Sequence, residues 1–211
     1  MSGSYPGEYL GRAASGADVG KGATAKVVAP VLPAREFAAA VAALPLVSVD
    51  WVVTNPEGQL LLGRRTNAPA RGWWFTPGGR IRKNEPLARA LQRVGQDELG
   101  LEADFCAQVL GNARLMGAWD HFYPNSAFDP EVSTHYVNLP HWLPLSWAEV
   151  AQLVLPIGEQ HSAWQWMPLK EVAENPIVHP YVQPYAAWLL RHDPVAACAS
   201  LPCGAAGFEP D

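Results

Sequence analysis

The segment from Gly78 to Leu101 constrains the fold of this chain more than any other part of its sequence. A pair of glycines is followed by a long helix-forming run that ends in a third glycine. Pro86 suits the first position of a helix, where its missing N–H costs nothing, and Gly100 suits the C-terminal end. Apolar residues recur at helical spacing, so we expect an amphipathic helix over residues 85–99.

The residue types in this segment favour a binding site over an ordinary surface helix. The Gly-Gly turn lets the backbone approach a ligand. Asp97 and Glu98 lie near the helix C-terminus, where an exposed acid costs about 0.3–1 kcal/mol, and Gly95 inside the helix costs about 1 kcal/mol relative to alanine. Glycine carbonyls and helix carboxylates are oxygen ligands of the kind that Mg²⁺ prefers. The alternative is a solvated amphipathic helix beside a plain glycine loop.

Positive charge is concentrated in the same region. Residues 64–93 contain eight Lys and Arg and a single acid, Glu85, whereas the whole chain of 211 residues has a net charge of −5. Such a block predicts a local anion site, and arginines can hold phosphates bidentately. The acidic overall charge excludes a general nucleic-acid binder.

Composition predicts one globular domain with loose ends. Hydrophobic residues make up 49% of the chain and charged residues 17%. No apolar run reaches the ~18 residues of a membrane span, and three unpatterned cysteines favour a reducing compartment, so we expect a cytoplasmic protein without a membrane partner. Residues 1–31 are expected to form a disordered extension, 32–193 the domain, and 194–211 a flexible tail.

Local patterns predict an α+β fold in which a mixed sheet is packed by helices. We expect strands over 46–54, 59–63, 73–76, 105–119, 132–145 and 163–167. Besides the helix over 85–99, we expect helices over 34–43, 146–153, 169–173 and 182–191.

The spacing of Gly79, Glu85, Arg93, Glu98 and the pair Gly100-Leu101 resembles the Nudix box. Two positions depart from that pattern. Val94 and Asp97 stand where the family usually has glutamates. These departures put the usual pyrophosphatase chemistry, which depends on a cluster of glutamates, in doubt.

The resemblance extends to the GDP-mannose mannosyl hydrolase branch of the Nudix hydrolases and covers roughly residues 32–192. It is carried by the runs Leu61-Leu62-Gly63-Arg64-Arg65-Thr66-Asn67-Ala68-Pro69, Gly72-Trp73-Trp74-Phe75-Thr76-Pro77-Gly78-Gly79-Arg80, Trp119-Asp120-His121-Phe122-Tyr123, Thr134-His135-Tyr136-Val137 and Glu159-Gln160-His161. It implies a Nudix-type mixed β-sheet sandwiched between helices, a Mg²⁺ cofactor and a homodimer.

The resemblance also implies roles for individual residues. One Mg²⁺ would be held by the metal ligands Gly78 (through its carbonyl), Glu98 and Gln160, and His161 would be the general base. The remaining site residues are the diphosphate-binding Arg65, Arg80 and Arg93, Asp50 and His121 around the sugar or leaving group, Tyr136 near the phosphates, and Phe37 on the guanine. Strand residues that satisfy one another across a sheet are the alternative for Asp50, His121 and Tyr136.

Three functions follow from this reading. The first is hydrolysis of GDP-mannose, or a related GDP-hexose, to GDP and free sugar by attack of water at the anomeric carbon. The second keeps the fold and cleaves the P–O–P bond of a nucleotide sugar, with Asp97 supporting a second metal. The third is a catalytically inactive domain that binds nucleotide sugars.

Overall fold

The computed structural model describes residues 32–126 and 129–192, which form one eight-stranded sheet and the helices that pack on it. The strands are β1 (Leu46–Thr54), β2 (Gln59–Arg65), β3 (Trp74–Phe75), β4 (Gly78–Arg80), β5 (Arg114–Leu115), β6 (Trp119–Tyr123), β7 (Thr134–Pro144) and β8 (His161–Pro168). The helices are α1 (Ala34–Ala43), α2 (Leu87–Leu99), α3 (Ala103–Leu110), α4 (Trp147–Val150), α5 (Leu169–Glu174) and α6 (Gln183–His192).

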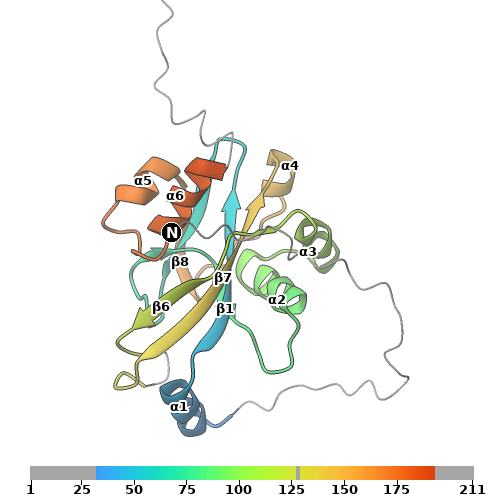
Figure 1. Ribbon diagram of the computed structural model, residues 1–211. Coiled ribbons are helices and arrows are strands. Elements are labelled where there is room, and N and C mark those ends of the chain that lie inside the picture. The colour runs from blue at the N-terminus through green and yellow to red at the C-terminus, as the bar shows by residue number, and fades with distance from the viewer. Residues whose placement is uncertain (1–31, 127–128, 193–211) are drawn as a thin grey trace, which may run out of the picture.

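The sheet is mixed, as the sequence predicts. β1 runs parallel to β7 from the pair Leu46↔Tyr136 to the pair Thr54↔Pro144, whereas the other pairings between strands are antiparallel. Helices cover both faces: α5 and α6 lie on one side of the sheet and α2 and α3 on the other (Figure 1). The predicted α+β class is therefore confirmed.

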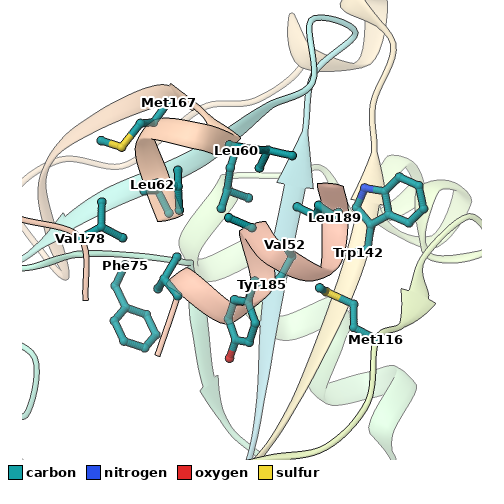
Figure 2. Close-up of a cluster of buried hydrophobic side chains, with 14 of the residues drawn as sticks. Val52, Leu60, Leu62, Phe75, Met116, Trp142, Met167, Val178, Tyr185 and Leu189 are labelled. Atoms are coloured by element: carbon teal, nitrogen blue, oxygen red, sulfur yellow. The ribbon is translucent and has the colours of Figure 1, made fainter. Parts of the chain in front are cut away.

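Alternation along β1 divides the core between the two faces. Val49, Trp51 and Val53 pack against α2 and α3. Val52 points to the opposite face and joins a second cluster with β2, α5 and α6 (Figure 2). This second cluster includes Leu60, Leu62, Phe75, Met167, Val172, Tyr185 and Leu189. Asp50 lies two residues from Val52, so it belongs to the face that α6 covers.

β1 and β2 separate along part of their length, and this separation positions the site. They pair only at Thr54↔Leu60. Further along, β1 pairs with β4, while β2 pairs with β3 and β8. The residues expected to carry function gather around the place where the sheet opens. Those on the diverging strands and on the N-terminal end of β7 are Asp50, Arg65, Gly78, Arg80, His161 and Tyr136.

Two expectations about secondary structure are wrong. The predicted strand over 105–119 begins as helix α3, because Phe105, Cys106 and Val109 bury one helical face against α2. The Gly-Gly segment is not a simple turn: Gly78–Arg80 forms β4 and pairs with β1. The long helix is otherwise as expected, except that it begins at Leu87, with Pro86 as its N-cap.

The expected N-terminal extension (1–31) and C-terminal tail (194–211) lie outside the described residues. Within the described part of the chain, every helix is too short or too polar to cross a membrane.

Candidate active site

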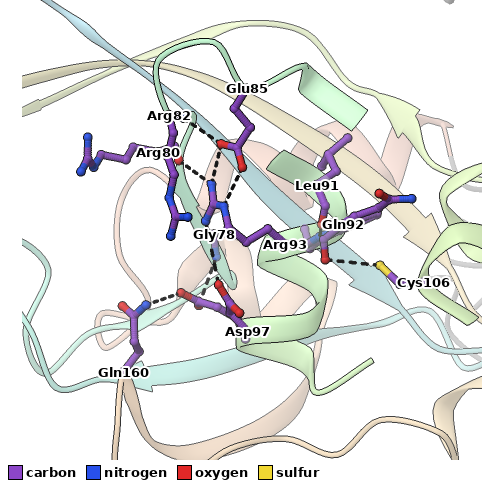
Figure 3. Close-up of polar contacts among 12 residues, drawn as sticks. Gly78, Arg80, Arg82, Glu85, Leu91, Gln92, Arg93, Asp97, Cys106 and Gln160 are labelled. Carbon is purple, nitrogen blue, oxygen red and sulfur yellow. Dashed lines mark hydrogen bonds and ion pairs between the residues drawn. The ribbon is translucent and has the colours of Figure 1, made fainter. Parts of the chain in front are cut away.

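An ion pair fixes the glycine segment to α2. The Arg93 guanidinium donates to both oxygens of Glu85, at 2.7 and 2.9 Å, and to the carbonyl oxygen of Arg80 at 2.9 Å (Figure 3). This bond network lowers the pKa of Glu85 and ties both ends of the connecting loop together. Asp97, the i+4 neighbour of Arg93, is 4.0 Å from its other nitrogen. The structure thus shows Arg93 organising the loop, and its contact with a diphosphate stays a prediction.

The departure of the box at Val94 has a packing reason. Its side chain is 1% exposed and belongs to the core on the α2 face. A Cβ atom added to Gly79 would lie 3.2 Å from the Val94 side chain, so helix and strand meet closely there. A glutamate in this orientation would have to bury its charge, whereas valine fills the space.

Glu98 is the buried acid of the site. It is 3% exposed, accepts a hydrogen bond from the Gly78 amide at 3.3 Å, and accepts another from the Gln160 side chain at 2.6 Å. Burial raises the pKa of Glu98 to about 7, and the nearby positive charge of Arg65 offsets part of this shift. The three expected metal ligands are therefore neighbours in the structure.

The strand register leaves the Gly78 carbonyl available. Hydrogen bonds from Trp51 N–H to the Pro77 carbonyl and from Ile81 N–H to the Val47 carbonyl define the bonded pairs of β1 and β4. Gly78 lies opposite Asp50, between bonded pairs, so its N–H and carbonyl point away from β1. A Cβ atom at Gly78 would overlap the Asp50 carboxylate, which explains why glycine is needed here.

This donor set fits Mg²⁺. It offers a carboxylate whose pKa is raised by burial, a carbonyl not used by β1, and the amide of Gln160. All three supply oxygen, which is the ligand that Mg²⁺ prefers. The Gln160 amide presents its nitrogen to Glu98 here, and a half-turn of the amide would present its oxygen instead.

His161 lies beside Glu98, beneath the backbone of β2. A Cβ atom at Gly63 would overlap the imidazole ring. The Nδ1 atom is 3.8 Å from a Glu98 oxygen, and neither ring nitrogen has a hydrogen-bond partner among the described residues. Burial and the charge of Arg65 lower the pKa of His161 to about 4, so the ring is neutral near pH 7. We call the hollow between these groups the glutamate pocket; it is lined by Asp97, Glu98, Pro156, Glu159, Gln160 and His161.

A second pocket, which we call the aspartate pocket, opens on the α6 side of Gly78. Asp50 lies on its wall, and burial raises the pKa of this carboxyl to about 6 despite hydrogen bonds from Asn138, Thr76 and Tyr185. The lining residues are Ser48, Asp50, Arg65, Pro69, Ala70, Phe75, Thr76, Gly78, Gly79, Arg80, His121, Tyr123 and Tyr136. The structure therefore brings Arg65, Arg80, Asp50, His121 and Tyr136 to one pocket.

The cations of the sequence block divide into separate groups. Arg65 is half-buried, and its Nε atom has no hydrogen-bond partner within 32–126 and 129–192. Its positive charge lowers the pKa of both Asp50 and Glu98, against the effect of burial. Arg80 is exposed, and its guanidinium lies 4.3 Å from the centre of the Phe37 ring. Phe37 is buried under this cation, and its expected stacking on guanine stays a prediction.

Sequence reasoning missed the residues that hold Asp50. One of its carboxylate oxygens accepts from the Thr76 hydroxyl at 3.1 Å, the Asn138 amide at 2.8 Å and the Tyr185 hydroxyl at 3.1 Å. Asn138 and Tyr185 come from β7 and α6. The available signal was Asn138 in the middle of the predicted strand over 132–145, because a polar side chain inside a sheet indicates a buried polar contact without identifying its partner.

Comparison with known proteins identifies the class to which this fold and site belong. The family model described as "NUDIX domain" matches residues 44–189, and the chain belongs to the Nudix family of hydrolases. Enzymes of this family generally use a divalent metal ion.

One relative and two solved structures show what this chain is similar to within and beyond the family. The low-salt glycan biosynthesis protein Agl8 of Haloferax volcanii is 40% identical over 156 residues, which are 73% of this chain and 88% of that protein. Among solved structures, a MutT protein of Methanosarcina mazei Go1 has a TM-score of 0.55 at 16% identity and covers 72% of this chain and 98% of its own. A MutT NUDIX hydrolase of Burkholderia pseudomallei has a TM-score of 0.50 at 25% identity and covers 68% and 95%.

Proposed function

We propose that this protein hydrolyses GDP-mannose, or a related GDP-hexose, to GDP and free sugar with the help of Mg²⁺. The observation that carries the proposal is the burial of the three α2 positions at which the Nudix box usually has acids. Glu98 is buried at the site, Asp97 is exposed, and the third position is Val94, which packs in the core. One buried carboxylate suits a single ion on a leaving diphosphate better than several ions around an attacked phosphorus.

Each part of the chain has a task in this reaction. Gly78, Glu98 and Gln160 would hold the ion, which when bound would stabilise negative charge on the diphosphate. Arg65 and Arg80 bind the diphosphate from the aspartate pocket. Attack by water on the anomeric carbon inverts its configuration, and neutral His161 takes the proton from that water.

The aspartate pocket supports a sugar at the other end of the substrate. Asp50 and His121 offer hydrogen-bonding groups, and Phe75, Tyr123 and Tyr136 add apolar ring surface. Hexoses have both hydroxyl groups and apolar C–H faces, so a mixed wall of this kind suits them. The match to a protein named for glycan biosynthesis agrees with a sugar substrate.

Reaction in ¹⁸O-labelled water decides which bond breaks. We expect the label in free mannose, because the proposed attack is on carbon. Label in a phosphate product would replace this proposal with cleavage of the P–O–P bond, for which Asp97 beside Glu98 would support a second ion. Absence of Mg²⁺-dependent turnover across a panel of nucleotide sugars would leave the inactive, nucleotide-sugar-binding domain.

Three further expectations belong to the same proposal. Guanine recognition through Phe37, assembly into a homodimer, and a cytoplasmic location all come from the resemblance or from composition. A panel of ADP-, UDP- and GDP-sugars tests the first, and the molar mass in solution tests the second.

A further inference from the structure

Tyr185 joins two residues of the aspartate pocket without lining the pocket itself. It lies on α6, is fully buried, and its hydroxyl oxygen is 3.1 Å from Asp50 and 3.2 Å from the Nε2 atom of His121. Asn138 also donates to this hydroxyl oxygen. A single hydroxyl group thus contacts an acid and a histidine that reach the pocket from β1 and β6.

The protons of this network can be assigned by counting donors and acceptors. With Asp50 ionised, the Tyr185 hydroxyl donates its one proton to the carboxylate. The hydroxyl oxygen then accepts from Asn138 on one side, so its remaining lone pair requires a donor from His121. Asn138 completes the network because its side-chain oxygen accepts from Ser48 at 2.8 Å. The contact between the Tyr185 hydroxyl oxygen and His121 is therefore a hydrogen bond only if His121 has its proton on Nε2.

Packing around the His121 ring restricts the rotation that would exchange the positions of its two nitrogens. Tyr181 stacks on it with the ring centres 4.2 Å apart and the planes 3° from parallel. The Tyr181 hydroxyl is itself held by the backbone of Phe122, accepting from its N–H at 2.7 Å and donating to its carbonyl at 2.8 Å. Burial lowers the pKa of His121 to about 4, so the ring near pH 7 is neutral and has one acceptor nitrogen.

Asp50 is oriented by the same network. Its Oδ2 atom accepts from Thr76, Asn138 and Tyr185, which come from three different parts of the fold. Its Oδ1 atom lies over the Cα atom of Gly78, beside the space that a Cβ atom would fill. The donors therefore occupy one oxygen and leave the other toward the pocket.

We propose that Tyr185 is a positioning residue for the sugar end of the substrate. It fixes His121 as the Nε2–H tautomer and holds Asp50 with Oδ1 toward the pocket, so that both residues offer acceptors to sugar hydroxyl groups. This inference rests on the proposed function for the identity of the ligand. The tautomer itself depends only on the hydrogen-bond network.

Imidazole ¹⁵N spectra of the full-length protein at pH 8 test the tautomer without any substrate. The chain has six histidines, and loss of signals in His121→Asn identifies those of His121. We expect a protonated Nε2 and an unprotonated Nδ1 in the wild type. In Tyr185→Phe the donors of Asn138 and His121 lose their acceptor, so the Nδ1–H tautomer becomes populated.

Kinetics and binding separate positioning from general structural damage. We expect Tyr185→Phe to lower kcat/KM for GDP-mannose about tenfold and to change the Kd of GDP by less than about twofold, because the arginines that hold the diphosphate are untouched. Thr54→Val is the matched control. It removes another buried hydroxyl group, the acceptor of Trp142 at 2.9 Å, outside both pockets. We expect it to leave the His121 signals and both constants unchanged.

The outcomes are distinct. An Nδ1–H tautomer in the wild type, an unchanged His121 spectrum in Tyr185→Phe, or equal losses in GDP binding and in kcat/KM would each overturn the proposal. If Tyr185→Phe does not fold, the ¹⁵N spectrum of His121 in the wild type still tests the proposal, because the proposal requires the Nε2–H tautomer. Failure of the wild type to hydrolyse GDP-mannose, with the Nε2–H tautomer present, would refute the proposed function and leave intact the assignment that Tyr185 fixes the His121 tautomer.

Discussion

The glutamate pocket and the aspartate pocket lie on either side of Gly78 and differ in how well their polar groups are satisfied. In the glutamate pocket, both nitrogens of His161 are buried without hydrogen-bond partners among the described residues, and burial raises the pKa of Glu98 to about 7. The aspartate pocket also has a nitrogen without a partner among the described residues, Arg65 Nε, but its acid, Asp50, accepts three hydrogen bonds from neighbouring side chains. The first pocket has the chemistry of a site that gains stability from a cation, and the second is organised before any ligand binds.

Substitution of Glu98 should have the largest effect. We expect Glu98→Gln to lower kcat by about 10³-fold or more, equivalent to ~4 kcal/mol, and to abolish the rise in melting temperature that Mg²⁺ causes in the wild type. The matched control is Asp97→Asn, which changes the adjacent exposed acid and should cost less than about tenfold. A loss in Asp97→Asn as large as that in Glu98→Gln would instead indicate a second metal.

The same variant tests the cost of burying the acid. A carboxyl whose pKa is raised in the folded state favours folding at low pH and loses this contribution as pH rises through about 7. Without Mg²⁺, Glu98→Gln should therefore melt a few degrees above the wild type at pH 8, and this difference should disappear near pH 4. Equal melting temperatures at both pH values would contradict the raised pKa of Glu98.

Gly63 should matter because it leaves room for His161. In Gly63→Ala the new Cβ atom would overlap the imidazole, so we expect the ring to move, kcat to fall about 10²-fold, and stability to fall by about 1–3 kcal/mol. Gly111→Ala is the control, since the nearest atom to its new Cβ would be 3.6 Å away. Activity and melting temperature of both variants test this, and an unaffected Gly63→Ala would exclude the placement of His161.

Substitution of Arg93 tests whether this residue supports activity by organising the loop or by contacting the diphosphate directly. A double-mutant cycle of Arg93→Ala and Glu85→Ala should give a coupling energy of about 1–2 kcal/mol in unfolding, because the pair is joined by two short hydrogen bonds. We expect Glu85→Ala to reduce activity nearly as much as Arg93→Ala. If Arg93→Ala alone weakens GDP binding, the guanidinium contacts the diphosphate directly.

The smallest expected effect is on acid stability. Burial lowers the pKa of His179 to about 4, and its Nδ1 atom accepts a hydrogen bond from the Tyr181 amide. The unfolded chain takes up this proton near pH 6.5, so the contribution of His179 is fully present above that pH and is lost as pH falls toward 4. His179→Gln should therefore lower the melting temperature at pH 8 and reduce its fall on acidification. A fall as steep as that of the wild type would show that His179 does not contribute.

Regular patterns along the chain were enough for much of the fold. The helix over 34–43 and the strand over 46–54 agree with α1 and β1 residue for residue, because prolines and turn residues mark their ends. The run over 105–119 failed because a short apolar stretch fits both a helix and a strand. Packing of Phe105 and Val109 against α2 favours the helix in the first part of this run.

The sequence by itself determined the chemical inventory of this protein: the glycine segment, the acid at Glu98, the cationic block and the box spacing that marks a Nudix domain. Local spacing carries such information because neighbours in the chain stay neighbours in the fold. Only the tertiary structure decided that Arg93 binds Glu85, that Val94 is core, and that Tyr185 joins Asp50 to His121. These contacts link residues on different elements, up to 135 positions apart in the chain, and depend on how the sheet and helices pack.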